Sequence, residues 1–126
     1  MLRLTSSRLQ QLWGLLVATI VLAPLFPFLG GESNPLDVYF NGHWVHFLAY
    51  AAVSFLPLLA WRRNTGVVLC AGMAVIGTGL EIANAIVQGR SPDIQYIVIN
   101  ALGIVAGMLL GLNILTLRSR RSQADT

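Results

Sequence analysis

The sequence predicts an all-α integral membrane protein, a bundle of four transmembrane helices with both termini in the cytoplasm. Of its 126 residues, 56% are hydrophobic and only 10% are charged, whereas roughly a quarter are charged in ordinary soluble domains. Four apolar runs are each about long enough to cross a hydrocarbon core about 30 Å thick. Seven of the eight arginines fall on one side of the resulting topology.

The first apolar run, 12–29, follows a short polar lead that carries Arg3 and Arg8. A basic start before an apolar core also describes a signal peptide. The run is longer than a usual signal core, however, and no clear small-x-small cleavage site follows it. We therefore expect an uncleaved first span, bent or ended by Pro24 and Pro27.

Three further spans are expected, at 43–61, 67–88 and 94–117. Only Arg62, Arg63 and Asn64 separate the second span from the third, so these two helices are expected to be antiparallel neighbours. A short polar turn joins the third span to the fourth. Residues 118–126 are expected to form a frayed cytoplasmic tail. The chain shows no internal repeat and no second domain, so residues 1–126 form a single membrane domain.

Orientation follows from the arginines. Only Arg90 lies on the side opposite both termini, and cytoplasmic segments are the ones enriched in basic residues. The chain is thus expected to be a multi-pass protein of the inner or plasma membrane, with both termini cytoplasmic. The arginines sit at the ends of apolar runs and form no basic face, so the pI near 9.8 reflects topology and no nucleic-acid partner is expected.

Neither a metal nor a cofactor is predicted. The single cysteine, Cys70, lies inside an apolar run, which excludes an internal disulfide and any cysteine-based metal site. His43 and His46 stand three residues apart with only distant carboxylates, which is a weak metal signal.

Polar side chains interrupt three spans at matching depths. At 1.5 Å per residue, Tyr50, Glu81 and Asn100 each lie roughly 10 Å below the outer ends of their helices. Each belongs to a helix face with further polar residues three or four positions away: His46, Tyr50 and Ser54; Glu81, Asn84 and Gln88; and Tyr96 and Asn100. We expect these faces to meet inside the bundle as one polar layer, with Arg90 and Asp93 at its mouth.

Each of these residues also has a structural interpretation. An ionised carboxylate inside the bilayer costs about 2.5–3.5 kcal/mol, so Glu81 needs a partner, a proton or water. It could serve a function, or hydrogen-bond Tyr50 or Asn100 and hold the helices together. Arg90 could bind a ligand or pair with Asp93 across the turn, and Asp93 is also placed to cap the fourth helix.

The fourth span contains small residues at a repeated spacing of four, Gly103, Gly107 and Gly111. Such glycines let helix backbones approach closely in lipid. Packing against a neighbouring helix of the same chain is the favoured interpretation, and a helix-mediated oligomer is the alternative.

Taken together, the motifs resemble the VanZ-like family, small multi-span membrane proteins named for a member of a glycopeptide-resistance cluster associated with teicoplanin resistance. The resemblance covers roughly 42–111 and consists of HFxxY at His46, a late-span Glu81, Arg-Ser-Pro-Asp at 90–93 and NxxGxxxG at Asn100. Where that family often has Asp-Lys, Gln and a second Asp, this chain has Gly42 with His43, Asn84, and Tyr96. The resemblance implies an envelope role and little mechanism.

Three classes of function remain open. As a binding or transport protein, the chain would hold an anionic lipid or lipid-linked envelope precursor at the outer leaflet. The ligand-binding candidates are His46, Tyr50, Glu81, Asn84, Arg90, Asp93 and Asn100. As an accessory protein, it would use the polar layer only to hold its helices together. As a lipid-modifying enzyme, the least favoured class, it would use His46 and Glu81 as an acid/base pair.

Overall fold

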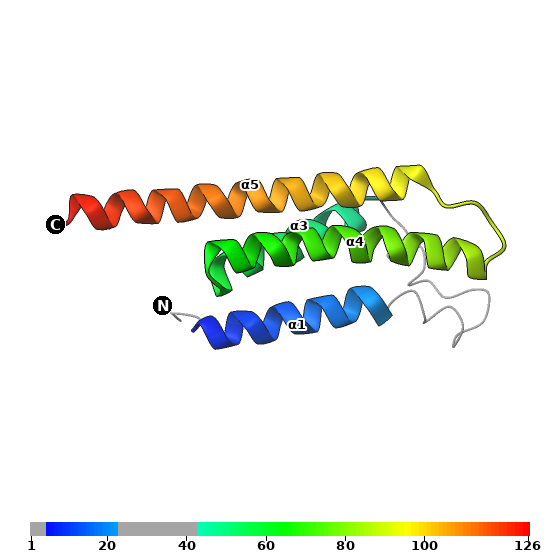
Figure 1. The fold of residues 1–126 in the computed structure, drawn as a ribbon, viewed down its shortest axis with the longest axis horizontal. Helices are drawn as coiled ribbons and strands as arrows, with labels where there is room; N and C mark the ends of the chain where they lie inside the picture. Colours follow the sequence, from blue (N-terminus) through cyan, green and yellow to red (C-terminus); the bar gives the residue numbers. More distant parts are fainter. Residues whose placement is uncertain (1–4, 23–42) are drawn as a thin grey trace.

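The computed structural model describes residues 5–22 and 43–126, and these form four helices. They are α1 (Ser6–Leu22), α3 (His43–Ala60), α4 (Arg63–Val87) and α5 (Ile94–Ala124). The helices share one long direction, with α5 and α1 on either side of α3 and α4 (Figure 1). Three of them, α3, α4 and α5, are long and apolar enough to cross a membrane. The all-α class is thus confirmed, and the three apolar helices agree with a multi-pass membrane protein.

The first expected span, 12–29, is described only as far as Leu22 in α1, and residues 23–29 with Pro24 and Pro27 lie outside the described residues. The other boundaries differ modestly from the expected ones. α4 begins at Arg63, earlier than expected, because Arg62 is extended (φ −62°, ψ 149°) and the helix starts directly after it.

The expectation of a frayed tail at 118–126 was wrong for most of that segment, because α5 remains helical as far as Ala124. No glycine or proline follows Gly111 to end the helix. Arginines near a helix C-terminus also interact favourably with the macrodipole, and Arg121 lies in the last turn of α5.

Helix α3 lies at the centre of the bundle. Its contact with α5 is the most extensive between any two described helices, and it also packs against α4 and α1. Gly103, Gly107 and Gly111 of α5 meet successively later positions of α3, around Tyr50, Ala51 and Leu58. The two helices therefore run parallel, and α5 packs chiefly on α3 and less on its hairpin partner α4.

The glycines of α5 allow this close approach. A Cβ added at Gly103 would lie 2.5 Å from the carbonyl oxygen of Phe47, and one at Gly107 would collide with the carbonyl oxygen of Ala51. At Gly111 the nearest atom would be Cδ1 of Leu58, at 2.6 Å. These glycines are buried, so they pack within the chain as favoured. An oligomer through them stays a prediction.

A hydrogen bond from α1 completes the backbone of α3. Pro57 lies inside α3 and has no N–H to donate to the carbonyl four residues earlier, that of Val53. An unpaired carbonyl in hydrocarbon costs several kcal/mol. The indole Nε1 of Trp13 in α1 donates to the Val53 oxygen at 2.8 Å. α1 therefore supplies a donor where α3 lacks its own.

A second contact fixes α1 nearer the end of α3. The side-chain Nε2 of Gln10 donates to the carbonyl oxygen of Ala60 at 3.2 Å, in the last turn, where helix carbonyls lack intrahelical partners. The rings of Trp13 and Trp61 meet edge to face with centroids 5.3 Å apart. α1 is thus held along the second half of α3.

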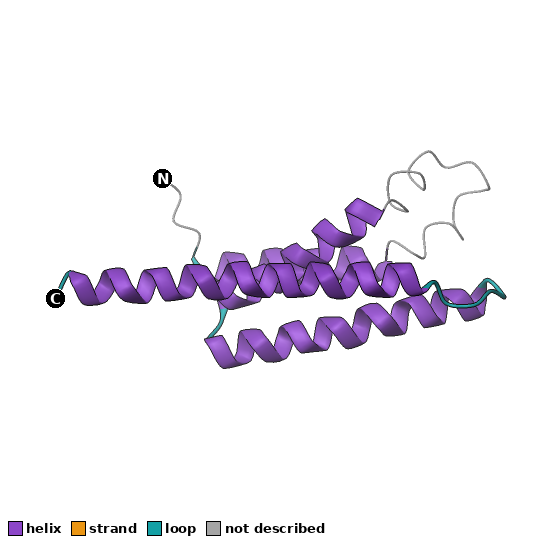
Figure 2. Cartoon of the chain, turned by 90° about the horizontal axis from the view of Figure 1, so that it is seen from above, coloured by secondary structure: helices purple, strands orange, loops and turns teal. Residues whose placement is uncertain are grey.

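The connections alternate between the two ends of the bundle. The start of α1, the α3–α4 turn and the end of α5 lie at one end, and the α4–α5 turn lies at the other (Figures 1 and 2). Arg62 and Arg63 of the α3–α4 turn and the arginines of late α5 therefore share one end of the bundle, as the sequence predicts.

We predict that Gly107→Ala weakens the α3–α5 contact. The added methyl group meets backbone atoms of Ala51, which cannot swing aside, and overpacking of this kind costs about 1–3 kcal/mol. Gly79→Ala is the matched control, because a Cβ at Gly79 meets nothing within 4 Å. SDS titration should show a lower free energy of unfolding for the first variant and no loss for the second. Equal stability of the two would contradict the close packing.

We also predict that the stability cost of Trp13→Phe depends on residue 57. In the wild-type background the substitution leaves the Val53 carbonyl unpaired and should cost about 1–3 kcal/mol. Pro57→Ala restores the helical N–H that bonds this carbonyl, so Trp13→Phe should then cost less. Free energies of unfolding of the two single variants and the double variant measure this coupling. An identical cost in both backgrounds would disprove the compensation.

Candidate functional site

Glu81 is a buried carboxylate with two hydrogen-bond donors. Its side chain is 9% exposed. The Oε1 atom accepts from Nη1 of Arg90 at 3.0 Å and from the backbone N–H of Asp93, also at 3.0 Å. The charge that would be costly in hydrocarbon is thus met by a guanidinium and by a backbone dipole.

The turn after α4 brings these donors back to Glu81. Gly89 has a φ of +65°, which a residue without Cβ adopts readily. Its N–H bonds the oxygen of Ile86 at 3.1 Å, and the N–H of Arg90 bonds that of Ala85 at 3.0 Å. These two bonds form the Schellman motif, which ends a helix with satisfied carbonyls.

Asp93 begins α5 beside the Glu81 carboxylate. Its Oδ1 accepts from the N–H of Gln95 at 2.9 Å, so the predicted capping role is confirmed. The N–H of Asp93 itself points to Glu81. The carboxylate therefore lies at the N-terminus of α5, where the helix macrodipole favours a negative charge.

Arg90 is held in position by hydrogen bonds to three residues, Glu81 in α4, Gln88 at the end of α4, and Ser91 in the turn. Besides Glu81, its Nε donates to Oε1 of Gln88 at 2.9 Å, and Nη1 also donates to the carbonyl oxygen of Ser91 at 3.2 Å. Gln88 in turn donates from Nε2 to Oδ1 of Asn84 at 3.0 Å. The ion-pair partner of Arg90 is Glu81, and not Asp93 as the structural interpretation had it, because the Asp93 carboxylate is used as the cap.

One edge of the guanidinium remains available. Nη2 of Arg90 donates no hydrogen bond within the described ranges, and its side chain is 37% exposed. Nη1 and Nε are directed toward the protein, so Nη2 with its two N–H groups is the part of the side chain able to meet a ligand.

Tyr50 of α3 fills the space between α4 and α5. Its side chain is buried. A Cβ at Gly77 would lie 2.7 Å from Cε1 of its ring, and one at Gly103 would lie 3.2 Å from its Cβ. Gly77 is four residues before Glu81, and Gly103 is three after Asn100. Tyr50 therefore packs about one helical turn inward of both.

Asn100 is the least satisfied member of the polar layer. Its side chain is 5% exposed, and Oδ1 is buried with no hydrogen-bond partner in the described part of the chain. The hydroxyl oxygen Oγ of Ser54, on α3, is likewise buried without a hydrogen-bond partner among the described residues. Burial of Tyr50, Glu81 and Asn100 agrees with the expectation that all three face the interior. Among the described residues, however, no direct hydrogen bond links these three side chains.

His46 meets α5 through an aromatic ring. The centroids of His46 and Tyr96 lie 4.8 Å apart with the planes tilted at 55°, and His43 stacks on the same ring at 4.8 Å. The candidate set omitted Tyr96 and Gln88, although their spacing of four from Asn100 and Asn84 signalled both. Within the described residues, no group of three His, Cys, Asp or Glu side chains is placed to hold a metal ion.

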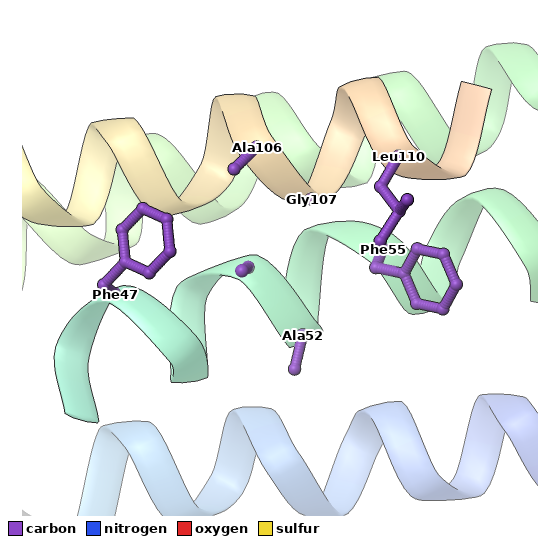
Figure 3. A pocket seen from close by; sticks show the side chains of 7 residues that line it. Phe47, Ala52, Phe55, Ala106, Gly107 and Leu110 are labelled. Atoms are coloured by element: carbon purple, nitrogen blue, oxygen red, sulfur yellow. The ribbon is translucent and has the colours of Figure 1, made fainter. Parts of the chain in front are cut away.

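A shallow apolar hollow of about 290 Å³ lies elsewhere, between α3 and α5. Phe47 borders one end, and Phe55 and Leu110 border the other, with Gly107 between them (Figure 3). None of the predicted ligand-binding residues lines it. This hollow is therefore apolar and separate from the site around Glu81 and the α4–α5 turn.

We predict that Glu81 and Arg90 are energetically coupled. Glu81→Gln and Arg90→Gln should each lower the free energy of unfolding by roughly 1.5–3 kcal/mol, the range for hydrogen bonds to charged groups. The double variant leaves no unpaired charge, so it should lose clearly less than the sum of the two. SDS titration of the four proteins measures the coupling. Simple additivity would show that the ion pair contributes nothing.

The chain was compared with family models, curated proteins and solved structures. No family model matches the chain. No curated protein matches it either. The search of solved structures also gave no match.

Proposed function

We propose that this chain is a VanZ-like protein of the cell membrane that binds the phosphate of an anionic lipid or lipid-linked envelope precursor at the outer leaflet. The observation that carries the proposal is the orientation of the Arg90 guanidinium group. Glu81 holds Nη1, while Nη2 is unused by the described residues and the side chain is partly exposed. Each of the two Nη2 hydrogens can donate a charge-assisted hydrogen bond to a phosphate oxygen.

The proposed topology places this guanidinium at the level of lipid phosphates. α1 serves as the first of four spans, with both termini cytoplasmic, and the α4–α5 turn faces the other side. The arrangement of the helix ends supports this orientation (Figure 1). The arginine distribution supports it as well.

The resemblance to the VanZ-like family gains a physical rationale from the same contacts. The late-span glutamate and the Arg-Ser-Pro-Asp motif are one unit here, since Glu81 Oε1 bonds both Arg90 and Asp93. The glycines of the NxxGxxxG motif set α5 against the helix that carries HFxxY. These contacts give each motif a reason to occur together with the others.

A second candidate is an accessory protein whose polar layer is structural. One observation favours it: Arg90 already makes hydrogen bonds with Glu81, Gln88 and Ser91. An arginine that only closes the α4–α5 turn would use these bonds and need no ligand. The lipid experiment below separates the two candidates.

For topology, we expect reporter fusions after Arg63 and after Thr126 to report a cytoplasmic location. A fusion after Ser91 should report the opposite side. The physical reason is retention of arginine-rich segments in the cytoplasm during insertion. A C-terminal fusion that reports an outside location would overturn the orientation.

For lipid binding, we expect Arg90→Lys to weaken, and Arg90→Gln to abolish, retention of a phosphate-bearing lipid by the purified protein. A lysine ammonium is a single point donor, so it cannot bond Glu81 and Gln88 in the way that directs Nη2 of Arg90 outward and still reach a phosphate. Native mass spectrometry of protein extracted in mild detergent measures retention directly.

A control distinguishes two causes of lost lipid binding in Arg90→Gln: removal of the phosphate contact, and destabilisation of the fold by an unpaired Glu81. The double variant Glu81→Gln with Arg90→Gln removes both charges and should be more stable than Arg90→Gln alone. If Arg90 binds phosphate, lipid retention stays low in the double variant although its fold is restored. Recovery of lipid binding together with stability would assign Arg90 a structural role and favour the accessory candidate.

A further inference from the structure

The last part of α5 extends past the rest of the bundle at its arginine-rich end. α5 contains 31 residues, and about 20 residues suffice to cross a hydrocarbon core of about 30 Å. Counted from Ile94, the apolar part of α5 ends at Leu117, within the range of about 17–25 residues that cross a bilayer, so residues 118–124 lie at the level of the lipid head groups or beyond. Both views show this end of α5 projecting past the other helices (Figures 1 and 2).

One face of this extension is apolar at its inner end and basic at its outer end. Ile114, Leu117, Arg118 and Arg121 line a shallow, open groove on the surface of α5 alone. Their spacing of three and four places them on one side of the helix. Leu117 and the two arginines are exposed, and neither guanidinium forms an ion pair within the described ranges.

We propose that this face binds one anionic phospholipid of the leaflet at the arginine-rich end. Arg118 and Arg121 hold the head-group phosphate, and the acyl chain lies along Leu117 and Ile114. The order of side chains along the helix matches the order of a phospholipid from tail to head. The surface lies at the end of the bundle opposite Arg90, so it is independent of the proposed function.

Charge complementarity supports an anionic occupant. Six arginines of the described residues gather at this end: Arg8, Arg62, Arg63, Arg118, Arg120 and Arg121. The acidic side chain nearest to them in sequence is Asp125. Basic segments beside a membrane span attract anionic lipids, each arginine contributing about a factor of five in affinity. An acidic water-soluble partner would use the same arginines but gain nothing from Leu117 and Ile114.

The experiment compares two variants that remove equal charge. Arg118→Gln with Arg121→Gln alters the proposed surface, and Arg62→Gln with Arg63→Gln removes two charges from the α3–α4 turn at the same end. Native mass spectrometry of the purified full-length proteins follows titration with phosphatidylglycerol or phosphatidylcholine. Any lipid at Arg90 forms a background common to all variants. All four arginines are exposed, so the fold tolerates both changes, and thermal unfolding verifies this.

The expected result is a loss of phosphatidylglycerol affinity of at least roughly thirtyfold in the α5 variant, which loses hydrogen bonds to the phosphate as well as charge, and a clearly smaller loss in the control, which loses charge alone. Phosphatidylcholine binding should be weak throughout. Leu117→Gln should also weaken phosphatidylglycerol binding, because the acyl chain loses its contact. Equal losses in the two double variants would reduce the effect to net charge and overturn the proposal. An unchanged phosphatidylglycerol affinity in Leu117→Gln would show that the acyl chain makes no contact with this face and would overturn the proposed lipid placement.

Discussion

The structure depends on one constraint: hydrocarbon offers no hydrogen bonds, so buried polar groups in a spanning helix need partners from the protein. Two buried polar groups receive hydrogen bonds in this way, one on the backbone and one on a side chain. The carbonyl left unpaired by Pro57 receives the indole N–H of Trp13. The carboxylate of Glu81 receives the guanidinium of Arg90 and the N–H of Asp93. Each of these contacts joins segments that the sequence separates.

The magnitudes show that the hydrogen bonds to Glu81 suffice. Insertion of an ionised carboxylate costs about 2.5–3.5 kcal/mol. A hydrogen bond to a charged group returns about 1.5–3 kcal/mol, and a helix N-terminus about 0.3–1 kcal/mol. The carboxylate accepts two such hydrogen bonds, so the gains at least match the cost and the bundle accommodates the charged pair. Its effect is positional: it fixes the α4–α5 turn and directs Nη2 of Arg90 outward.

Much of the fold could be predicted from the sequence. Apolar runs indicated α3, α4 and α5, and the spacing of Gly103 and Gly107 indicated a close helix contact. The partner helix in that contact could not be predicted. The glycine spacing indicates that another helix can approach closely, but it does not indicate which helix packs there. The helical tail to Ala124 was missed because the polar composition of residues 118–126 fits a frayed end as well as an exposed helix.

The candidate site divides in the same way. Helical spacing correctly put Glu81, Asn100 and Tyr50 in the interior, since each side chain is buried. The pairing of Arg90 with Glu81 was missed because nine residues separate them, and only the positive φ of Gly89 folds the turn back. The bond from Trp13 to Val53 required knowing that α1 lies against Pro57. Long-range docking of this kind leaves no periodic trace in a sequence.

The central claim is that Glu81 positions Arg90 to contact a lipid phosphate. The most direct measurement is solid-state NMR in phosphate-bearing lipid bilayers, with ¹⁵N in the arginine guanidinium groups and dephasing by ³¹P. The account predicts close ¹⁵N–³¹P contact in a component that disappears in Arg90→Lys and is reduced in Glu81→Gln, which leaves Arg90 in place but unanchored. Identical dephasing in all three proteins would show that no phosphate lies at Arg90 and would contradict the account.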